Sequence, residues 1–212
     1  MPTMLGAEEP RRYLLVVQNN AEPRATGGIA GAYIDLAVDD GRFTLGEYRA
    51  SADLLVDEEV AELTEDELAV FTRRMALYPQ DANFTPEFPR AAALLQGFWR
   101  EGPGIDVDGV VSIDPVALGY LLEGRAPIDV DGVEISSATV AEELLSEVYT
   151  RHPGADDQDA FFASAAAGVA DALLGSGTPS VAGLTRAIEE GRFLVWSQDQ
   201  EEQTLLASAE IG

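Results

Sequence analysis

The chain of 212 residues contains no cysteine and no lysine, and its only histidine is His152. The lack of cysteine excludes disulfide bonds, thiolate metal sites and cysteine nucleophiles. The lack of lysine excludes Schiff-base chemistry, so every strongly cationic side chain is one of the 13 arginines. A single histidine excludes a metal site made of several histidines. Because His152 lies in a polar segment, we interpret it as a loop residue.

Positive charge is also scarce, since 13 basic residues against 38 acidic ones give a net charge of −25. Contacts with nucleic-acid phosphates need basic surface, so this balance excludes nucleic acid as a partner and disfavours docking on anionic lipid. No apolar run reaches the roughly 18 residues of a membrane-spanning helix, and no signal-peptide pattern is present. Both ends of the sequence resemble cut points, so we expect a membrane anchor only in segments outside this chain.

The hydrophobic content of 46% and the chain length are typical of one globular domain, which we expect over residues 1–212. Strand patterns mixed with amphipathic helical segments predict a layered α/β fold with a mixed β-sheet flanked by helices. The expected strands are 13–18, 31–38, 42–49, 107–113 and 193–196, with a continuation over 52–56 and a hairpin over 128–135. The expected helices are 65–77, 85–100, 115–123, 139–149, 158–174, 180–190 and 199–209.

The most informative stretch is the polar segment 18–31, which lies between the first two expected strands. It contains three amides, one carboxylate, one guanidinium and three glycines. A strand that is followed by such a segment predicts a polar loop at the end of the sheet, where ligands tend to bind. Arg24 offers a planar fork for phosphate or carboxylate, and the glycines permit close backbone approach. The alternative is a tight, internally hydrogen-bonded turn.

Other cations are expected near the same sheet. Arg49 ends the third expected strand shortly before Asp53, and Arg90 lies in the first turn of a helix that follows a loop containing Asn83. A cluster of guanidinium forks could hold a diphosphate, and a carboxylate with Mg²⁺ could then support phosphoryl transfer. The alternative for each arginine, including Arg42, is a simple ion pair with one of the 38 acidic residues.

The run from Tyr13 to Gly31 carries the signature Gln-Asn-Asn-x-Glu-x-Arg-x-x-Gly-Gly. Together with segments 39–42, 83–89 and 107–118, it resembles an actinobacterial family of unknown function. Members of that family are membrane-anchored envelope proteins encoded among exopolysaccharide genes. The resemblance therefore implies an extracytoplasmic location in the cell envelope and a role connected with polysaccharide.

The order of elements is also similar, more distantly, to the LytR-CpsA-Psr phosphotransferases. These enzymes move a glycan from a polyprenyl-pyrophosphate carrier to the cell wall, and they use Mg²⁺, aspartates and arginines. The matching features are an acidic-x-Arg loop at Glu22 to Arg24, a hairpin ending at Arg49, and a loop around Asn83. That family places a metal-binding Asp after its glycine-rich segment, where residues 28–31 carry no carboxylate.

This second resemblance implies a LytR-CpsA-Psr-like fold, a polyprenyl-linked glycan or cell-wall polymer as partner, and Mg²⁺ as cofactor, with metal ligands that the sequence does not identify. The residues that it assigns to catalysis are Glu22, Arg24 and Asp53. The residues that we expect to bind substrate, on this resemblance together with the polar segment and the helix start, are Asn19, Asn20, Arg49, Asn83 and Arg90.

Three functions remain open at this point. The first is a Mg²⁺-dependent glycopolymer phosphotransferase, and the second is a non-catalytic module that binds a lipid-linked glycan. The third is a structural domain in a polysaccharide export complex. The first two require a positive pocket where the polar segment meets the neighbouring hairpin.

Overall fold

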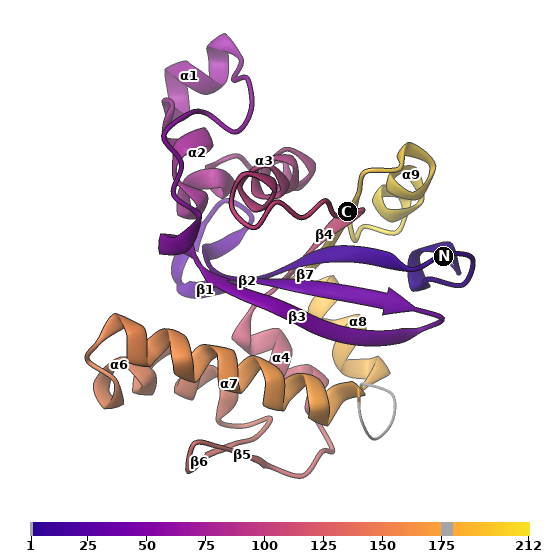
Figure 1. The fold of residues 1–212 in the computed structure, drawn as a ribbon. Coiled ribbons are helices and arrows are strands. Elements are labelled where there is room, and N and C mark those ends of the chain that lie inside the picture. The colour runs from indigo at the N-terminus through magenta and orange to yellow at the C-terminus, as the bar shows by residue number, and fades with distance from the viewer. Residues whose placement is uncertain (1, 175–179) are drawn as a thin grey trace. The chain divides into compact units, whose positions relative to one another are not determined.

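The computed structural model of the protein describes residues 2–174 and 180–212 (Figure 1). Its contacts divide the chain into two compact units. The sheet unit comprises Met1–Ser112 with Leu194–Gly212, and the helical unit comprises Ile113–Phe193. The expectation of a single domain over 1–212 stays a prediction. No helix of the described residues is both long and apolar enough to cross a membrane.

The sheet unit is organised around a five-stranded mixed sheet, which confirms the predicted α/β architecture. Its strands follow the order β3-β2-β1-β4-β7. They are β1 (Arg11–Arg24), β2 (Gly27–Asp39), β3 (Arg42–Ala50), β4 (Gly109–Ile113) and β7 (Phe193–Ser197). β1 pairs antiparallel with β2, and β2 pairs antiparallel with β3.

The polar segment 18–31 forms part of a hairpin, so the prediction of a loop between two separate strands is wrong. β1 continues to Arg24, a turn occupies residues 25 and 26, and β2 begins at Gly27. The reason is non-local: the ladder of β1 and β2 resumes beyond an irregular stretch, and it pairs Arg24 with Gly27 across the turn.

The helical segments of the sheet unit follow local signals only in part. They are η1 (Thr3–Leu5), η2 (Ser51–Leu54), α1 (Glu65–Phe71), α2 (Arg74–Leu77), η3 (Pro79–Phe84), α3 (Phe88–Glu101) and α9 (Gln200–Ser208). A capping box opens α1, because Thr64 Oγ1 accepts the N–H of Glu67 and Glu67 accepts the N–H of Thr64. The predicted helix 65–77 is broken, since Thr72 has a φ of 61°, which α-helix does not allow.

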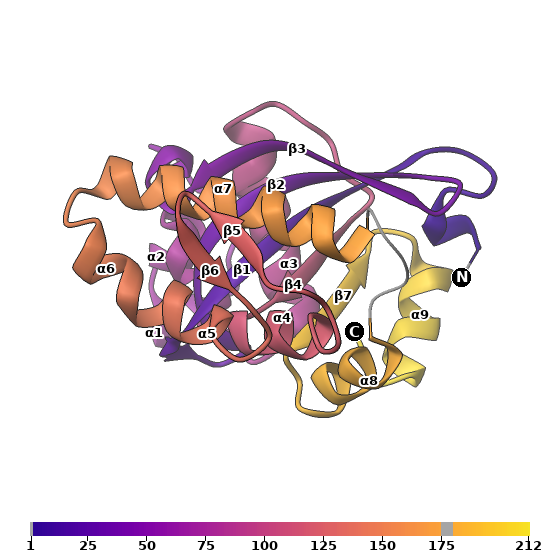
Figure 2. The same ribbon diagram turned by 90° about the horizontal axis from the view of Figure 1, so that it is seen from below.

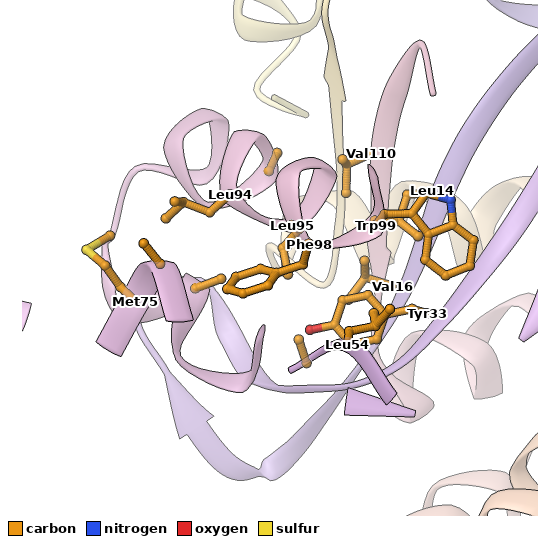
Figure 3. Close-up of a cluster of buried hydrophobic side chains, with 14 of the residues drawn as sticks. Leu14, Val16, Tyr33, Leu54, Met75, Leu94, Leu95, Phe98, Trp99 and Val110 are labelled. Carbon is orange, nitrogen blue, oxygen red and sulfur yellow. The ribbon is translucent and has the colours of Figure 1, made fainter. Parts of the chain in front are cut away.

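The hydrophobic core of the sheet unit lies between α3 and one face of the sheet (Figure 3). Phe98 and Trp99 of α3 are fully buried, as are Leu14 and Val16 of β1 and Tyr33 of β2. Burying one such side chain contributes about 1.5–3 kcal/mol. This packing holds α3 and the segment before it against the hairpin, and it thereby positions η3 beside β2.

The helical unit contains the remaining elements. They are α4 (Pro115–Leu121), β5 (Ile128–Val130), β6 (Val133–Ile135), α5 (Val140–Glu142), the π-helical turn η4 (Glu143–Glu147), α6 (Val148–Arg151), α7 (Ala155–Leu174) and α8 (Val181–Glu189). The predicted hairpin is confirmed, with positive φ at Asp131 and Gly132 as a type I′ turn requires. β5 packs on α7, where Gly168 leaves room for Val130 (Figure 2).

Candidate functional site at the tip of the β1–β2 hairpin

The β1–β2 ladder is irregular near the tip of the hairpin. Asn19 lies opposite Ile29, whereas Pro23 lies opposite Gly28, the next residue back along β2. Residues 20–22 therefore have no counterpart on β2 and form a bulge. Bulges re-aim side chains and are common beside functional sites, because the residues they contain are released from ladder pairing.

Two buried amide side chains hold the backbone of Gly28. Gln18 Oε1 accepts the Gly28 N–H at 2.8 Å, and Asn83 Nδ2 donates to the Gly28 carbonyl at 2.7 Å. A Cβ at Gly27 would lie 1.9 Å from Gln18 Oε1, and a Cβ at Gly28 would lie 2.1 Å from the carbonyl oxygen of Asn19. A side chain at Gly28 would clash with the backbone, and a side chain at Gly27 would be strained because that residue has a φ of 131°.

The contacts with Gly28 fix which way each amide points. The oxygen of Gln18 must face an N–H and the nitrogen of Asn83 must face a carbonyl, so neither amide can be reversed without losing its bond. Gln18 Nε2 and Asn83 Oδ1 remain, and both are buried without a hydrogen-bond partner. Three further polar atoms at the hairpin tip are also buried without a hydrogen-bond partner, namely Asn20 Oδ1, Arg24 Nε and Thr26 Oγ1. We call the five residues the hairpin-tip cluster: Gln18, Asn20, Arg24, Thr26 and Asn83.

Arg24 is the one cation of this cluster. Its Nη1 donates to the carbonyl of Pro23 at 3.1 Å, and its guanidinium carbon lies 5.4 Å from the centre of the Phe84 ring. Arg24 forms no ion pair with any carboxylate of the residues that the structure describes. A weakly hydrated guanidinium resting on an aromatic ring keeps its remaining donors for an anion. Phe84 follows Asn83 directly in the chain, so the guanidinium lies next to the amides.

The other two predicted anion-binding arginines are committed to carboxylates. Arg90 Nε donates to Glu67 at 2.6 Å, and its Nη2 donates to Glu67 at 3.0 Å and to the carbonyl of Glu62 at 2.8 Å. These bonds lower the pKa of Glu67. Arg49 pairs with Glu47 and donates to the backbone of Tyr48. Acidic neighbours therefore satisfy two of the three arginines, and of the three only Arg24 has no carboxylate partner among the described residues.

The predicted catalytic carboxylates are not arranged to hold a metal ion. Asp53 accepts the N–H of Ala50 at 3.0 Å and so caps η2, and Glu22 is exposed on the bulge. η2 also replaces the strand expected over 52–56. Within residues 2–174 and 180–212, no three His, Asp or Glu side chains are grouped so that they could hold a metal. The described residues therefore form no site that would hold Mg²⁺ by three or more protein ligands.

The remaining predicted residues divide between the bulge and the core. Asn19 is partly exposed and its Oδ1 accepts the N–H of Ala21 at 3.0 Å, while Asn20 belongs to the hairpin-tip cluster. The sequence interpretation missed Gln18 as a site residue. A signal was present, because Leu14, Val16 and Gln18 alternate on one face of a strand, which predicts a buried amide.

Comparison with solved structures identifies the fold. The protein gbs0355 from Streptococcus agalactiae is 13% identical, with a TM-score of 0.54 over 95% of this chain and 73% of that chain. The Bacillus subtilis protein yvhJ, described as a transcriptional regulator, is 13% identical, with a TM-score of 0.52 over 96% of this chain and 77% of that chain. B. subtilis TagV is 13% identical, with a TM-score of 0.49 over 95% and 79% of the two chains. The likenesses to gbs0355 and yvhJ confirm the predicted LytR-CpsA-Psr-like fold.

The sequence also places the chain in a family. Residues 8–149 match the model of a family described as a protein of unknown function, DUF4012, and the chain belongs to that family. The match spans the hairpin tip, η3 and α3. A comparison with curated proteins finds no match.

Proposed function

We propose that this protein binds the phosphate of a polyprenyl-linked glycan through Arg24, as a non-catalytic module of cell-envelope or exopolysaccharide biosynthesis. The observation that carries this proposal is the uncommitted guanidinium of Arg24 beside buried amides that also lack partners. In a chain with a net charge of −25, most arginines find a carboxylate, so a guanidinium without one is available for another anion.

Binding is favoured over group transfer by the chemistry of the site. Phosphoryl transfer needs charge neutralisation around the transferred group, usually by metal ions together with several cations. Here Arg49 and Arg90 are engaged by Glu47 and Glu67, and Asp53 is engaged as a cap. A single guanidinium with neutral hydrogen-bonding neighbours can hold a phosphate. It provides little of the charge neutralisation that the transition state of phosphoryl transfer requires.

The net charge of the protein shapes how such a ligand is bound. A molecule with a net charge of −25 repels anions at long range, while Arg24 attracts them at short range. Salt screens the long-range repulsion more than a contact between a phosphate and a partly buried guanidinium. We therefore expect binding to tolerate physiological salt, unlike binding to a broadly basic surface.

The location and the partner follow from the same proposal. A polyprenyl-linked glycan that is being attached or exported is met on the outer side of the membrane, so the domain would work extracytoplasmically. Contact with the bilayer would come through the ligand or through segments outside this chain, because the acidic surface disfavours anionic lipid.

The test uses phosphatidylcholine vesicles prepared with and without a polyprenyl pyrophosphate. We expect the protein to sediment only with the loaded vesicles, and Arg24→Gln to weaken this association by about tenfold or more, as loss of a charge-assisted phosphate contact predicts. Arg42→Gln is the matched control, because Arg42 is exposed at the start of β3, next to the β2–β3 turn, and the charge change is the same.

Two outcomes would overturn the proposal. An equal loss of vesicle binding in the two variants would mean that net charge alone matters. Failure of the wild-type protein to sediment with the loaded vesicles would mean that polyprenyl pyrophosphate is not its ligand. Release of pyrophosphate-linked sugar from a polyprenyl donor, abolished by Arg24→Gln, would instead establish a phosphotransferase.

A further inference from the structure

The break between α1 and α2 lies at a strained residue. Thr72 has a φ of 61° and a ψ of −177°, a combination that is essentially restricted to glycine and persists only where the surrounding structure enforces it. The sequence favours the opposite, because Leu68, Phe71 and Met75 have the spacing of one helix face and predict a continuous helix over residues 65–77. Local preference and tertiary structure therefore disagree at Thr72, which makes this residue a candidate hinge.

α2 is fixed in the core, whereas α1 is not. Met75 and Ala76 of α2 are fully buried, and the carbonyl of Ala76 accepts the N–H of Val60 at 3.0 Å. None of the seven residues of α1 is buried, and the helix lies at the outer end of the sheet unit, beyond α2 (Figure 1). A helix this short is marginal by itself, so its position depends on contacts with other elements. A change at the hinge therefore moves α1 and leaves α2 in place.

Two contacts connect α1 with α3 and η3. Glu67 of α1 forms an ion pair with Arg90 of α3, and the ring of Phe71 lies 6.4 Å from the ring of Phe84 in η3. Phe84 is also the ring on which the guanidinium of Arg24 rests, at 5.4 Å. The last residue of α1 therefore supports, through one aromatic ring, the cation to which we assign phosphate binding.

From this arrangement we propose that α1 is a two-state clamp that regulates the phosphate site. In the clamped form, which the structure shows, the chain is broken at Thr72 and Phe71 supports the Phe84 ring beside Arg24. In the released form Thr72 becomes helical, α1 and α2 join into one helix, and Phe71 moves away from Phe84. Relief of backbone strain favours release, and the contacts of α1 with α3 and η3 oppose it. The inference rests on the proposed phosphate binding at Arg24.

Phosphate binding and the state of the clamp are coupled in both directions. A phosphate that binds the clamped form more tightly shifts α1 towards that form, and a substitution that favours the clamped form tightens binding. Arg24 keeps its own contact with phosphate in both forms, so loss of its aromatic support weakens binding about threefold and does not abolish it. For the same reason Arg90→Gln, which removes the ion pair of α1, should weaken phosphate binding by no more than about threefold.

The experiment compares Thr72→Gly with Thr72→Ala, which move the equilibrium in opposite directions. Glycine adopts the observed φ without strain and is a poor helix former, so it favours the clamped form. Alanine is a better helix former than threonine and removes the hydroxyl that accepts the Arg74 N–H at 3.3 Å, so it favours the released form. Ala69→Gly is the matched control, because residue 69 is helical in both forms.

Two independent measurements follow the clamp. In the absence of ligand, hydrogen exchange should show the amides of residues 72–75 about tenfold more protected in Thr72→Ala than in Thr72→Gly, since these amides donate to carbonyls four residues earlier in the continuous helix. Isothermal titration with methyl phosphate should give an affinity about threefold lower for Thr72→Ala than for Thr72→Gly. The wild type and Ala69→Gly should bind as tightly as Thr72→Gly, because the clamped form predominates in them.

The outcomes separate the clamp from the phosphate site. Equal protection of residues 72–75 in the two Thr72 variants would overturn the hinge, and equal methyl phosphate affinities would overturn its effect on Arg24. In either case the phosphate site stands. An equal loss of affinity in Ala69→Gly and Thr72→Ala would also overturn the inference, because it would assign the effect to general loosening of α1. If the wild-type protein does not bind methyl phosphate, the proposed function fails together with the clamp.

Discussion

Gln18 and Asn83 hold opposite ends of one residue, because Gln18 accepts the N–H of Gly28 while Asn83 donates to its carbonyl. The two amides come from positions 65 residues apart, on β1 and η3. Their shared contact joins the hairpin tip to the segment that carries Phe84, on which Arg24 rests. The position of the guanidinium therefore depends on a glycine that it does not touch.

Replacing that glycine should disturb the fold locally. We expect Gly28→Ala to lower the free energy of unfolding by about 1–3 kcal/mol, as overpacking does, because its Cβ would lie 2.1 Å from the Asn19 carbonyl oxygen. Urea denaturation followed by circular dichroism measures this change. Gly31→Ala is the control on the same strand, since its Cβ would meet only the Val17 carbonyl oxygen at 3.8 Å. Equal effects of the two substitutions would contradict the account.

Arg24 and Arg90 should separate binding from stability. Arg90→Gln breaks the pair with Glu67, so we expect it to lower the free energy of unfolding by about 1–2 kcal/mol while phosphate binding is retained. Arg24→Gln should weaken phosphate binding by about tenfold or more with little effect on unfolding, because no carboxylate is left unpaired. Urea denaturation gives the free energy of unfolding of each variant, and calorimetric titration gives its affinity for phosphate. The reverse pattern would show that Arg90, not Arg24, is the anion site.

The helical unit should show an acid-dependent loss of stability at Glu190. Hydrogen bonds from Arg192, Arg186 and Tyr120 lower the pKa of Glu190 from 4.5 to about 2. A lowered pKa means that the carboxylate stabilises the fold above pH 4.5, and that this contribution is lost as the pH falls towards 2. Thermal unfolding of Glu190→Gln should therefore depend less on pH across that window than the wild type.

The neighbouring Glu189 provides the control for this pH effect. Glu189 makes no ion pair with the described residues, so Glu189→Gln should keep the wild-type pH dependence. Added salt should reduce the effect of Glu190, because its partners lie at the surface. A pH profile of Glu190→Gln identical to that of the wild type would contradict this interpretation.

Removal of divalent metal should not affect phosphate binding. Because Asp53 caps η2 and Glu22 lies exposed, we expect EDTA and added Mg²⁺ to leave the methyl phosphate affinity and the melting temperature unchanged. Asp53→Asn should change the free energy of unfolding little, because the amide oxygen can still accept the N–H of Ala50. Mg²⁺-enhanced binding that disappears in Asp53→Asn would instead restore a metal role for that carboxylate.

Features with local causes could be predicted from the sequence. The capping box at Thr64, the cap of α4 by Asp114 and the hairpin turn at Asp131 depend on residues within a few positions of one another. The mixed α/β sheet followed from the spacing of strand and helix patterns.

Features with distant causes could not be predicted. The hairpin tip is extended because β2 pairs with β1 beyond a three-residue bulge, and its composition of amides and glycines is equally typical of a loop. Arg90 satisfied every local expectation of an anion site, yet its carboxylate lies 23 residues away at Glu67. In a chain with 38 acidic residues, the tertiary structure determines which arginines have no carboxylate partner.

The most direct test of the account follows each arginine Nε–Hε group by NMR while inorganic phosphate is added. We predict that the largest shift occurs at Arg24, accompanied by the Gly28 amide, and that Arg42, Arg49 and Arg90 change little. Shifts centred on Arg42, or equal small shifts at every arginine, would show that phosphate has no site at the hairpin tip and would contradict the central claim.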